Sequence, residues 1–126
     1  MKGEKLHGKV IQMYKSGALH MCQWFFDDLP HGVHERWYEN GKPDEYREYK
    51  HGKLHGEFKV WHDNGQLLAH EIYDNGKLDG PQKRYYRDGT LRREGHYYQD
   101  IKVGTFKEYD EKGNLISKNF YEESPQ

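Results

Sequence analysis

The sequence predicts an all-β protein: one elongated, twisted antiparallel sheet of tandem β-hairpins, formed by five 24-residue repeats. Three observations carry this prediction. Glycines recur every 24 residues in two separate series, short aromatic and β-branched runs meet at Asn-Gly or Asp-Gly sites, and only 33% of the 126 residues are hydrophobic. An Asn-Gly pair between two such runs is a strong local hairpin signal. A large conventional core is therefore not expected.

Ten glycines define the repeat. The first series precedes the first strand of each copy, where glycine permits a positive φ or lets the aromatic column of a neighbouring copy lie against bare backbone. The second series falls in the turn of each hairpin. The first series is Gly8, Gly32, Gly56, Gly80 and Gly104, and the second is Gly17, Gly41, Gly65, Gly89 and Gly113.

We expect one repeat domain over residues 1–126, because the period never slips and five copies fill the chain. The copies, numbered one to five below, are approximately residues 3–26, 27–50, 51–74, 75–98 and 99–122, with a tail at 123–126.

Copy three fixes the expected turn. A two-residue loop at Asn64-Gly65 would pair Trp61 with Leu68, whereas a three-residue loop from Asp63 to Gly65 pairs Trp61 with Leu67. We favour the three-residue loop, with Gly65 in the left-handed conformation, because it places two apolar columns opposite each other. On this register Tyr73 would extend the Trp61 face, and Phe58 would not fit it.

Nine of the 19 aromatic residues belong to two columns that we expect to form a packing ladder. A smaller set departs from these columns or lies beside them, and exposed aromatics of this kind are enriched at protein interfaces. The ladder columns are Met13, Trp37, Trp61, Tyr85 and Tyr109, and Phe25, Tyr49, Tyr73, Tyr97 and Tyr121. The predicted contact residues are Trp24, Phe26, Tyr46, Tyr98 and Phe120.

Charge and cysteine content narrow the function classes. Twenty basic residues nearly balance 21 acidic ones, for a net charge of −1, which argues against nucleic acid as a partner. The single Cys22 cannot form an intramolecular disulfide, and neither a signal peptide nor an apolar membrane span is evident. We therefore expect a soluble cytoplasmic protein.

The repeated unit resembles a known family, the variant form of the MORN (membrane occupation and recognition nexus) repeat, as found in bacterial toxin-antitoxin-type proteins and some viral proteins. The resemblance rests on the segments 74–80 and 52–56, and on aromatic pairs such as Tyr85-Tyr86 and Trp37-Tyr38 followed by Asp-Gly or Asn-Gly. It implies a row of β-hairpins used for protein or lipid contact. No catalytic residue carries over.

Two copies depart from the pattern. Copy two has Pro30 and Pro43 in columns that otherwise hold mostly leucine, and copy five replaces the Gly-Lys-Leu lead with Asp100-Ile101-Lys102. We expect both copies to be locally less regular. Glu122 and the charged, proline-containing tail after it are typical of a protected sheet edge.

Catalysis and metal binding find little support. His7, His31 and His55 share one column, so they would stand roughly 10 Å apart and could not share one zinc ion. We interpret them as solvated or loop-ordering residues. None of the three serines lies beside an obvious histidine and carboxylate pair, and Cys22 occupies an ordinary face position. We predict no enzyme activity, no cofactor and no metal site.

The leading hypothesis is a non-enzymatic scaffold that binds a protein partner, in an antitoxin-like or immunity-like role by family resemblance. The sheet edges also suggest a homodimer. Two alternatives stay open: cell-wall or carbohydrate binding, because Trp-Tyr followed by Gly is similar to choline-binding wall repeats, and anionic lipid binding through Lys83-Arg84 and Arg92-Arg93. RNA stacking is disfavoured by the charge balance.

Overall fold

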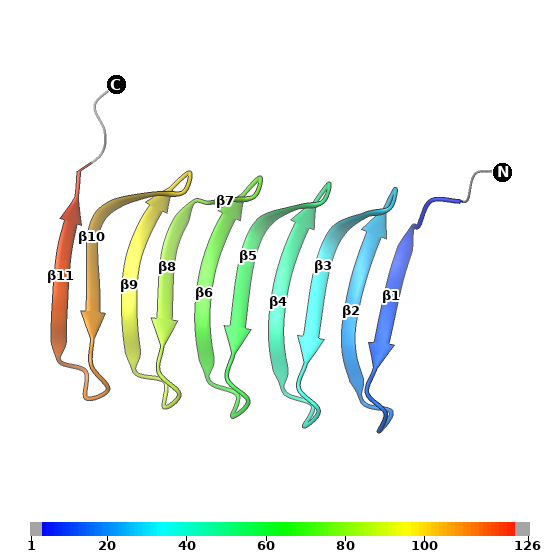
Figure 1. Ribbon diagram of the computed structural model, residues 1–126, viewed down its shortest axis with the longest axis horizontal. Coiled ribbons are helices and arrows are strands. Elements are labelled where there is room, and N and C mark those ends of the chain that lie inside the picture. Colours follow the sequence, from blue (N-terminus) through cyan, green and yellow to red (C-terminus); the bar gives the residue numbers. More distant parts are fainter. Residues whose placement is uncertain (1–3, 123–126) are drawn as a thin grey trace.

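The computed structural model describes residues 4–122, which form a single open antiparallel sheet with no helix (Figure 1). Neighbouring strands follow the chain from β1 to β11, so β1 and β11 lie at opposite ends. The predicted fold class is confirmed. Residue 3 of the first copy and the tail 123–126 lie outside the described residues. The strands are β1 (Gly8–Met13), β2 (Leu19–Phe26), β3 (Leu29–Trp37), β4 (Pro43–Lys50), β5 (Lys53–Trp61), β6 (Leu67–Asp74), β7 (Lys77–Leu78), β8 (Gly80–Tyr85), β9 (Leu91–Tyr98), β10 (Ile101–Tyr109) and β11 (Leu115–Tyr121).

Each copy forms one hairpin, and its turn has the predicted three-residue form. In copy three the His62 amide donates to the Gln66 carbonyl at 2.8 Å, and the Gly65 amide donates to the His62 carbonyl at 3.0 Å. Gly65 has φ 93°, and Trp61 pairs with Leu67 as predicted. The other second-series glycines have φ between 88° and 94°. These five turns lie side by side where the strands end, along the side of the sheet that we call the hairpin edge.

A different turn joins each copy to the next. Asn75 and Gly76 both have positive φ, 48° and 88°, which is the geometry of a two-residue type I′ turn. Asp27 and Asp28 adopt the same conformation. Aspartate adopts this conformation more readily than most residues other than glycine. The Asp28 carboxylate also ties the turn to the preceding copy, because it accepts a hydrogen bond from the Leu6 amide at 2.6 Å. These turns line the opposite edge, which we call the junction edge.

The first-series glycines serve one of the two predicted purposes, the positive φ; the side chains nearest to Gly56 and Gly80 are Glu48 and Ile72, not the aromatic column. All five have positive φ, from 74° to 135°. At the junction of β4 and β5 the pairing shifts, so that Glu48 faces the segment 55–57 with Gly56 at its centre. A Cβ on Gly56 would collide with the Glu48 carboxylate, and one on Gly80 would lie 3.1 Å from Cβ of Ile72. Only glycine relieves both constraints at these bulges.

The expectation that Tyr73 shares a face with Trp61 is wrong. The register shifts by one residue between Val60 and Trp61. Tyr73 therefore pairs with Gly56, and not with His55 as an unshifted register would require. Tyr73 therefore lies on the side of Phe58, and their ring centroids are 6.0 Å apart at 88°. Strand alternation turns Trp61 to the other side. The two ladder columns thus occupy opposite faces, and Phe58 now has a simple place.

We call the side of Phe58 and Tyr73 the tyrosine face. Phe106 lies there between Tyr97 and Tyr121, with centroid distances of 5.4 and 5.3 Å and nearly perpendicular rings. Few side chains are buried, because a single layer covers neither face. Within residues 4–122 the buried hydrophobic residues are Ala69, Val103 and Phe106, and the buried polar ones are Gln23, Glu45, Glu71 and Gln82.

The expected irregularity of copy two is also wrong. Pro43 is the first residue of β4, where the ladder does not need its missing amide, and Pro30 still offers its carbonyl to the Gly52 amide at 2.8 Å. The copy-five hairpin keeps the common register. Its lead is irregular as expected: Val103 pairs with His96, so that Gly95 faces the segment 104–106, whereas at the earlier junction Glu48 faces the segment 55–57. A further break falls in copy four, where Asp79 separates β7 from β8 and donates its amide to the Ile72 carbonyl at 2.9 Å.

A substitution at Gly95 would measure how closely side chains pack on the tyrosine face. A Cβ at this position would collide with the ring of Phe106. We expect Gly95→Ala to lower the free energy of unfolding by about 1–3 kcal/mol, as overpacking does elsewhere, measured by urea denaturation. In a Phe106→Val background the same change should cost much less. An equal cost in both backgrounds would contradict a steric origin.

Candidate binding surfaces

The five predicted contact residues share one face but do not meet. Trp24 and Phe26 lie on β2, Tyr46 on β4, Tyr98 on β9 and Phe120 on β11, all on the side opposite the tyrosine face. Phe120 is 69% exposed and Tyr98 is 64% exposed. The structure therefore separates them into a group near β2, a group near β9 to β11, and Tyr46 between.

Trp24 and Phe26 border an open groove of about 620 Å³. Phe26 lies between two imidazoles, with its ring centroid 5.3 Å from that of His7 and 6.0 Å from that of His31. The Lys9 ammonium lies 5.5 Å from the Trp24 ring. The groove is mostly apolar, and it is lined by His7, Gly8, Trp24, Phe25, Phe26, His31, Gly32 and Val33.

Tyr46 belongs to a polar network within the sheet. Its hydroxyl donates to the Glu48 carboxylate at 3.1 Å, and the Lys59 ammonium lies 6.0 Å from its ring. Burial, followed by the hydrogen bond to Glu48, raises the pKa of Tyr46 above its usual value. Its hydroxyl therefore stays protonated and already has a partner.

Sequence reasoning missed two residues that extend the exposed surface. Leu29 pairs with Phe26, and Ile101 pairs with Tyr98, each across a two-residue turn. All four side chains are between 47% and 64% exposed. We call these the apolar junction pairs. The available signal was the column that holds lysine in the other copies: Lys5, Leu29, Lys53, Lys77 and Ile101.

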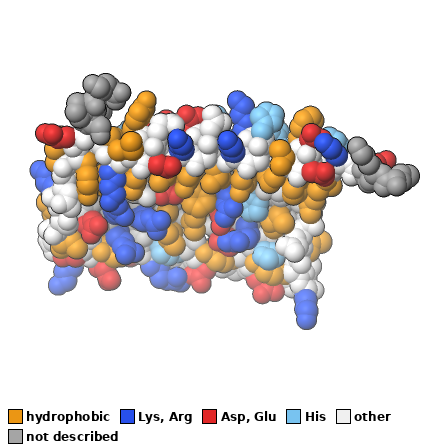
Figure 2. Space-filling model, turned by 45° about the horizontal axis from the view of Figure 1, so that its top comes forward, with side chains coloured by type: hydrophobic (Ala, Val, Ile, Leu, Met, Phe, Trp, Pro, Cys, Tyr) orange, Lys and Arg blue, Asp and Glu red, His pale blue; other side chains and the backbone are white. Residues whose placement is uncertain are grey.

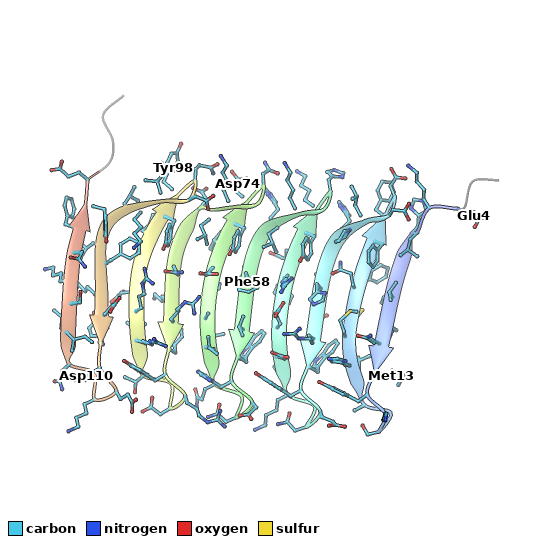
Figure 3. The ribbon with its side chains drawn as sticks, in the orientation of Figure 1. Glu4, Met13, Phe58, Asp74, Tyr98 and Asp110 are labelled. Atoms are coloured by element: carbon cyan, nitrogen blue, oxygen red, sulfur yellow. The ribbon has the colours of Figure 1, made fainter. Side chains whose placement is uncertain are left out.

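The apolar junction pairs stand apart along the junction edge. Six strand spacings of about 4.8 Å separate them, or roughly 29 Å. Between them the equivalent pairs are Lys50 with Lys53 and Asp74 with Lys77. Figure 2 shows hydrophobic side chains toward both ends of this edge and charged ones between, and Figure 3 places Tyr98 and Asp74 on the edge.

The histidine column orders the junction turns. His7, His31 and His55 each accept, through Nδ1, a hydrogen bond from the backbone amide of the residue 20 positions later, at 3.2 Å. The loop-ordering interpretation is confirmed. Within residues 4–122 no three His, Cys, Asp or Glu side chains are arranged to hold a metal ion. Cys22 is half-buried on β2 as a free thiol.

Charged groups on the tyrosine face form a network in copy two. The Arg36 guanidinium contacts the carboxylates of Asp44 and Glu45, each at 3.0 Å. Arg47 pairs with the other oxygen of Glu45, and its guanidinium lies 5.5 Å from the Phe58 ring. Further along this face, burial and then the Glu71 carboxylate raise the pKa of Tyr73 to about 12.

Five hairpins with one register define the class of this protein: a tandem β-hairpin repeat protein whose described residues form a single layer. The family model described as MORN repeat variant matches residues 30–51, 54–75, 78–99 and 102–123, more than half of the chain. The chain belongs to this family. Its repeats are generally binding modules and are generally non-catalytic. The hairpin β1–β2 precedes the matched copies and keeps their register.

Two further findings bear on function. No curated protein matches the chain. No helix in the described part of the chain is long and apolar enough to cross a membrane.

His34 couples the tyrosine face to pH. Its Nδ1 lies 2.8 Å from Gln23 Oε1, and burial, followed by the charge of Arg47, lowers its pKa below 6.5. The folded protein therefore binds this proton less readily than the unfolded chain. The stability from neutral His34 is complete above pH 6.5 and is lost as pH falls toward the lowered folded pKa.

We expect His34→Gln to reduce the loss of stability on acidification from pH 7.5 to pH 5, measured by urea denaturation at each pH. The exposed His96 provides the matched control, and His96→Gln should keep the wild-type pH dependence. If both variants behave like the wild type, His34 is not the group responsible.

Proposed function

We propose that this protein is a non-catalytic cytoplasmic module that binds a protein partner through its two exposed apolar ends. One observation carries the proposal. Exposed large hydrophobic side chains lie between residues 6 and 29 and between residues 98 and 120, and none lies between 30 and 97. Exposed apolar surface of this kind is typical of interaction sites.

The exposure of the apolar junction pairs is not explained by a position on an outer strand of the sheet. Phe26, Leu29, Tyr98 and Ile101 belong to β2, β3, β9 and β10, each of which has a neighbour on both sides. Their counterparts in the middle of the array are charged. The groove beside Trp24 adds a concave apolar site next to the first junction pair. A partner that spans the junction edge could thus bury both pairs and the groove.

The lipid alternative has less support from the geometry. Lys83 pairs with Glu94 on one face, whereas Arg84 pairs with Arg93 on the other. Lys83 therefore lies on the face opposite the three arginines of the two basic dipeptides, and Glu108 lies among those arginines. The basic residues thus form no continuous basic plane of the kind an anionic membrane attracts. The antitoxin-like form of the proposal and the carbohydrate alternative have no support from the comparisons.

The proposal predicts that a co-purifying protein depends on the apolar junction pairs. We would express the tagged chain in its source organism, identify retained proteins by mass spectrometry, and measure the affinity of the purified pair. Phe26→Ser with Leu29→Ser, or Tyr98→Ser with Ile101→Ser, should weaken binding by about 30-fold or more, because buried aromatic anchors contribute about 2 kcal/mol or more to such interfaces.

The matched control is Lys50→Ser with Lys53→Ser, the same pair of positions at a charged junction. It should leave the affinity within a few-fold of the wild type. Equal loss in the control, or no loss in either apolar double variant, would contradict the proposal.

Self-association through sheet edges is a second form of protein contact. Within residues 4–122 no strand covers the outer side of β1 or β11. Head-to-tail continuation would break a ladder in which the hydroxyls of Tyr14, Tyr38 and Tyr86 donate to a carbonyl of the next copy at 2.5–2.7 Å. Asp110 occupies this column in copy five, and its carboxylate accepts hydrogen bonds within its own turn. This argument disfavours a contact of β1 with β11, and the charged residues after β11, from Glu122 on, are typical of a protected edge. We therefore propose a symmetric dimer through β1.

Light scattering over a concentration range tests this dimer. We expect a species of twice the 15.2 kDa chain mass that Ile11→Lys on β1 disrupts, because an edge lysine blocks strand pairing. Ile116→Lys on β11 is the matched control and should leave the dimer intact. A single 15.2 kDa species at every concentration would rule out the dimer.

A further inference from the structure

Three arginines converge on the tyrosine face of copy four. Arg84 on β8 and Arg93 on β9 are directly paired across the two strands, and Arg93 also pairs with Glu108 on β10. Together with Arg92 these residues line a recess of about 190 Å³. The recess lies near the hairpin edge, far from the apolar junction pairs.

The cluster carries uncompensated positive charge. Like charges directly opposite each other on neighbouring strands destabilise a sheet. Within residues 4–122, none of the ion pairs closer than 4.0 Å involves Arg84, Arg92 or Arg93. Two guanidiniums rest over aromatic rings instead: Arg92 lies 5.7 Å from the Tyr86 ring and Arg93 lies 5.6 Å from the Phe106 ring. The aromatic rings thus support the two guanidinium planes but do not neutralise their positive charge.

Copy two shows what the same three positions hold when the charge is satisfied internally. There, 48 residues earlier, stand Arg36, Asp44 and Glu45, and both carboxylates contact the Arg36 guanidinium at 3.0 Å. In copy four the first arginine is kept as Arg84, and the two carboxylates are replaced by Arg92 and Arg93. The geometry that binds two carboxylate groups in copy two therefore lacks its anions in copy four.

We propose that Arg84, Arg92 and Arg93 form a binding site for a phosphomonoester group. Three guanidiniums and the Glu108 carboxylate leave an excess of two positive charges. A phosphorylated side chain carries about −1.5 to −2 at neutral pH. Guanidinium donors match the oxygens of such a group and bind them with charge-assisted hydrogen bonds.

The carrier of the phosphate is a phosphorylated segment of a protein, and in this respect the site rests on the proposed function. A small recess between strands accepts one phosphate, whereas a vesicle surface needs a continuous basic plane. Glu108 at the recess and a net chain charge of −1 disfavour such a plane. Binding of phosphate can be measured with a short peptide and needs no protein partner. A negative result with the peptide is therefore distinct from a negative result in the search for a protein partner.

Titration calorimetry on the full chain at low ionic strength tests the site with three probes: a short phosphoserine peptide, its unphosphorylated form, and phosphatidic acid vesicles. We expect binding of the phosphopeptide alone, and Arg84→Gln should weaken it about tenfold or more, as loss of a hydrogen bond to a charged group does. Lys83→Gln is the matched control, since it removes the same charge from the adjacent residue on the opposite face, and it should leave affinity nearly unchanged.

A second variant separates binding from folding. Arg93→Glu restores the arginine and glutamate arrangement of copy two, so it should raise the urea midpoint of the free protein while abolishing phosphopeptide binding. The proposal is overturned if the unphosphorylated peptide binds equally well, if Lys83→Gln weakens binding as much as Arg84→Gln, or if only the vesicles bind. It is also overturned if Arg93→Glu retains full affinity.

Discussion

Backbone pairing between successive hairpins carries this structure, because a sheet of one layer has no second layer to bury its faces. Each copy contacts only its neighbours, as in other repeat arrays, so stability is added one junction at a time. The junctions depend on glycine: Gly56 occupies a bulge at positive φ where the Glu48 side chain leaves no room for a Cβ. The 24-residue period therefore reflects a backbone requirement as much as a side-chain pattern.

The repeat determines which positions meet between strands, but it does not determine which residue types occupy those positions. On the tyrosine face, side chains 11 residues apart meet at every junction between copies, yet each junction uses a different interaction. They are an amide with an imidazole, a guanidinium over a ring, a carboxylate with an amide, and a bare glycine under a ring. The four pairs are Gln23 and His34, Arg47 and Phe58, Glu71 and Gln82, and Gly95 and Phe106. Such variation gives each copy its own surface without altering the sheet.

Function in this architecture follows from differences between equivalent positions. The junction pairs are apolar at Phe26 and Tyr98 and charged at Lys50 and Asp74. The column of Arg36 and Arg84 is neutralised in copy two and surrounded by further arginines in copy four. A thin sheet exposes both faces and both edges, so several such sites can operate on one small chain. This arrangement suits binding better than catalysis, which needs groups enclosed together.

The sequence by itself determined the repeat, the hairpin order and the three-residue turn, because glycine spacing and turn chemistry act locally. It also identified the exposed aromatic residues such as Trp24 and Tyr98 as departures from their columns. The faces of the sheet were decided by tertiary structure, since a one-residue bulge beside Trp61 moves every later side chain to the other side. The convergence of Arg84 with Arg93 likewise depended on pairing between strands, which no local pattern of residues specifies.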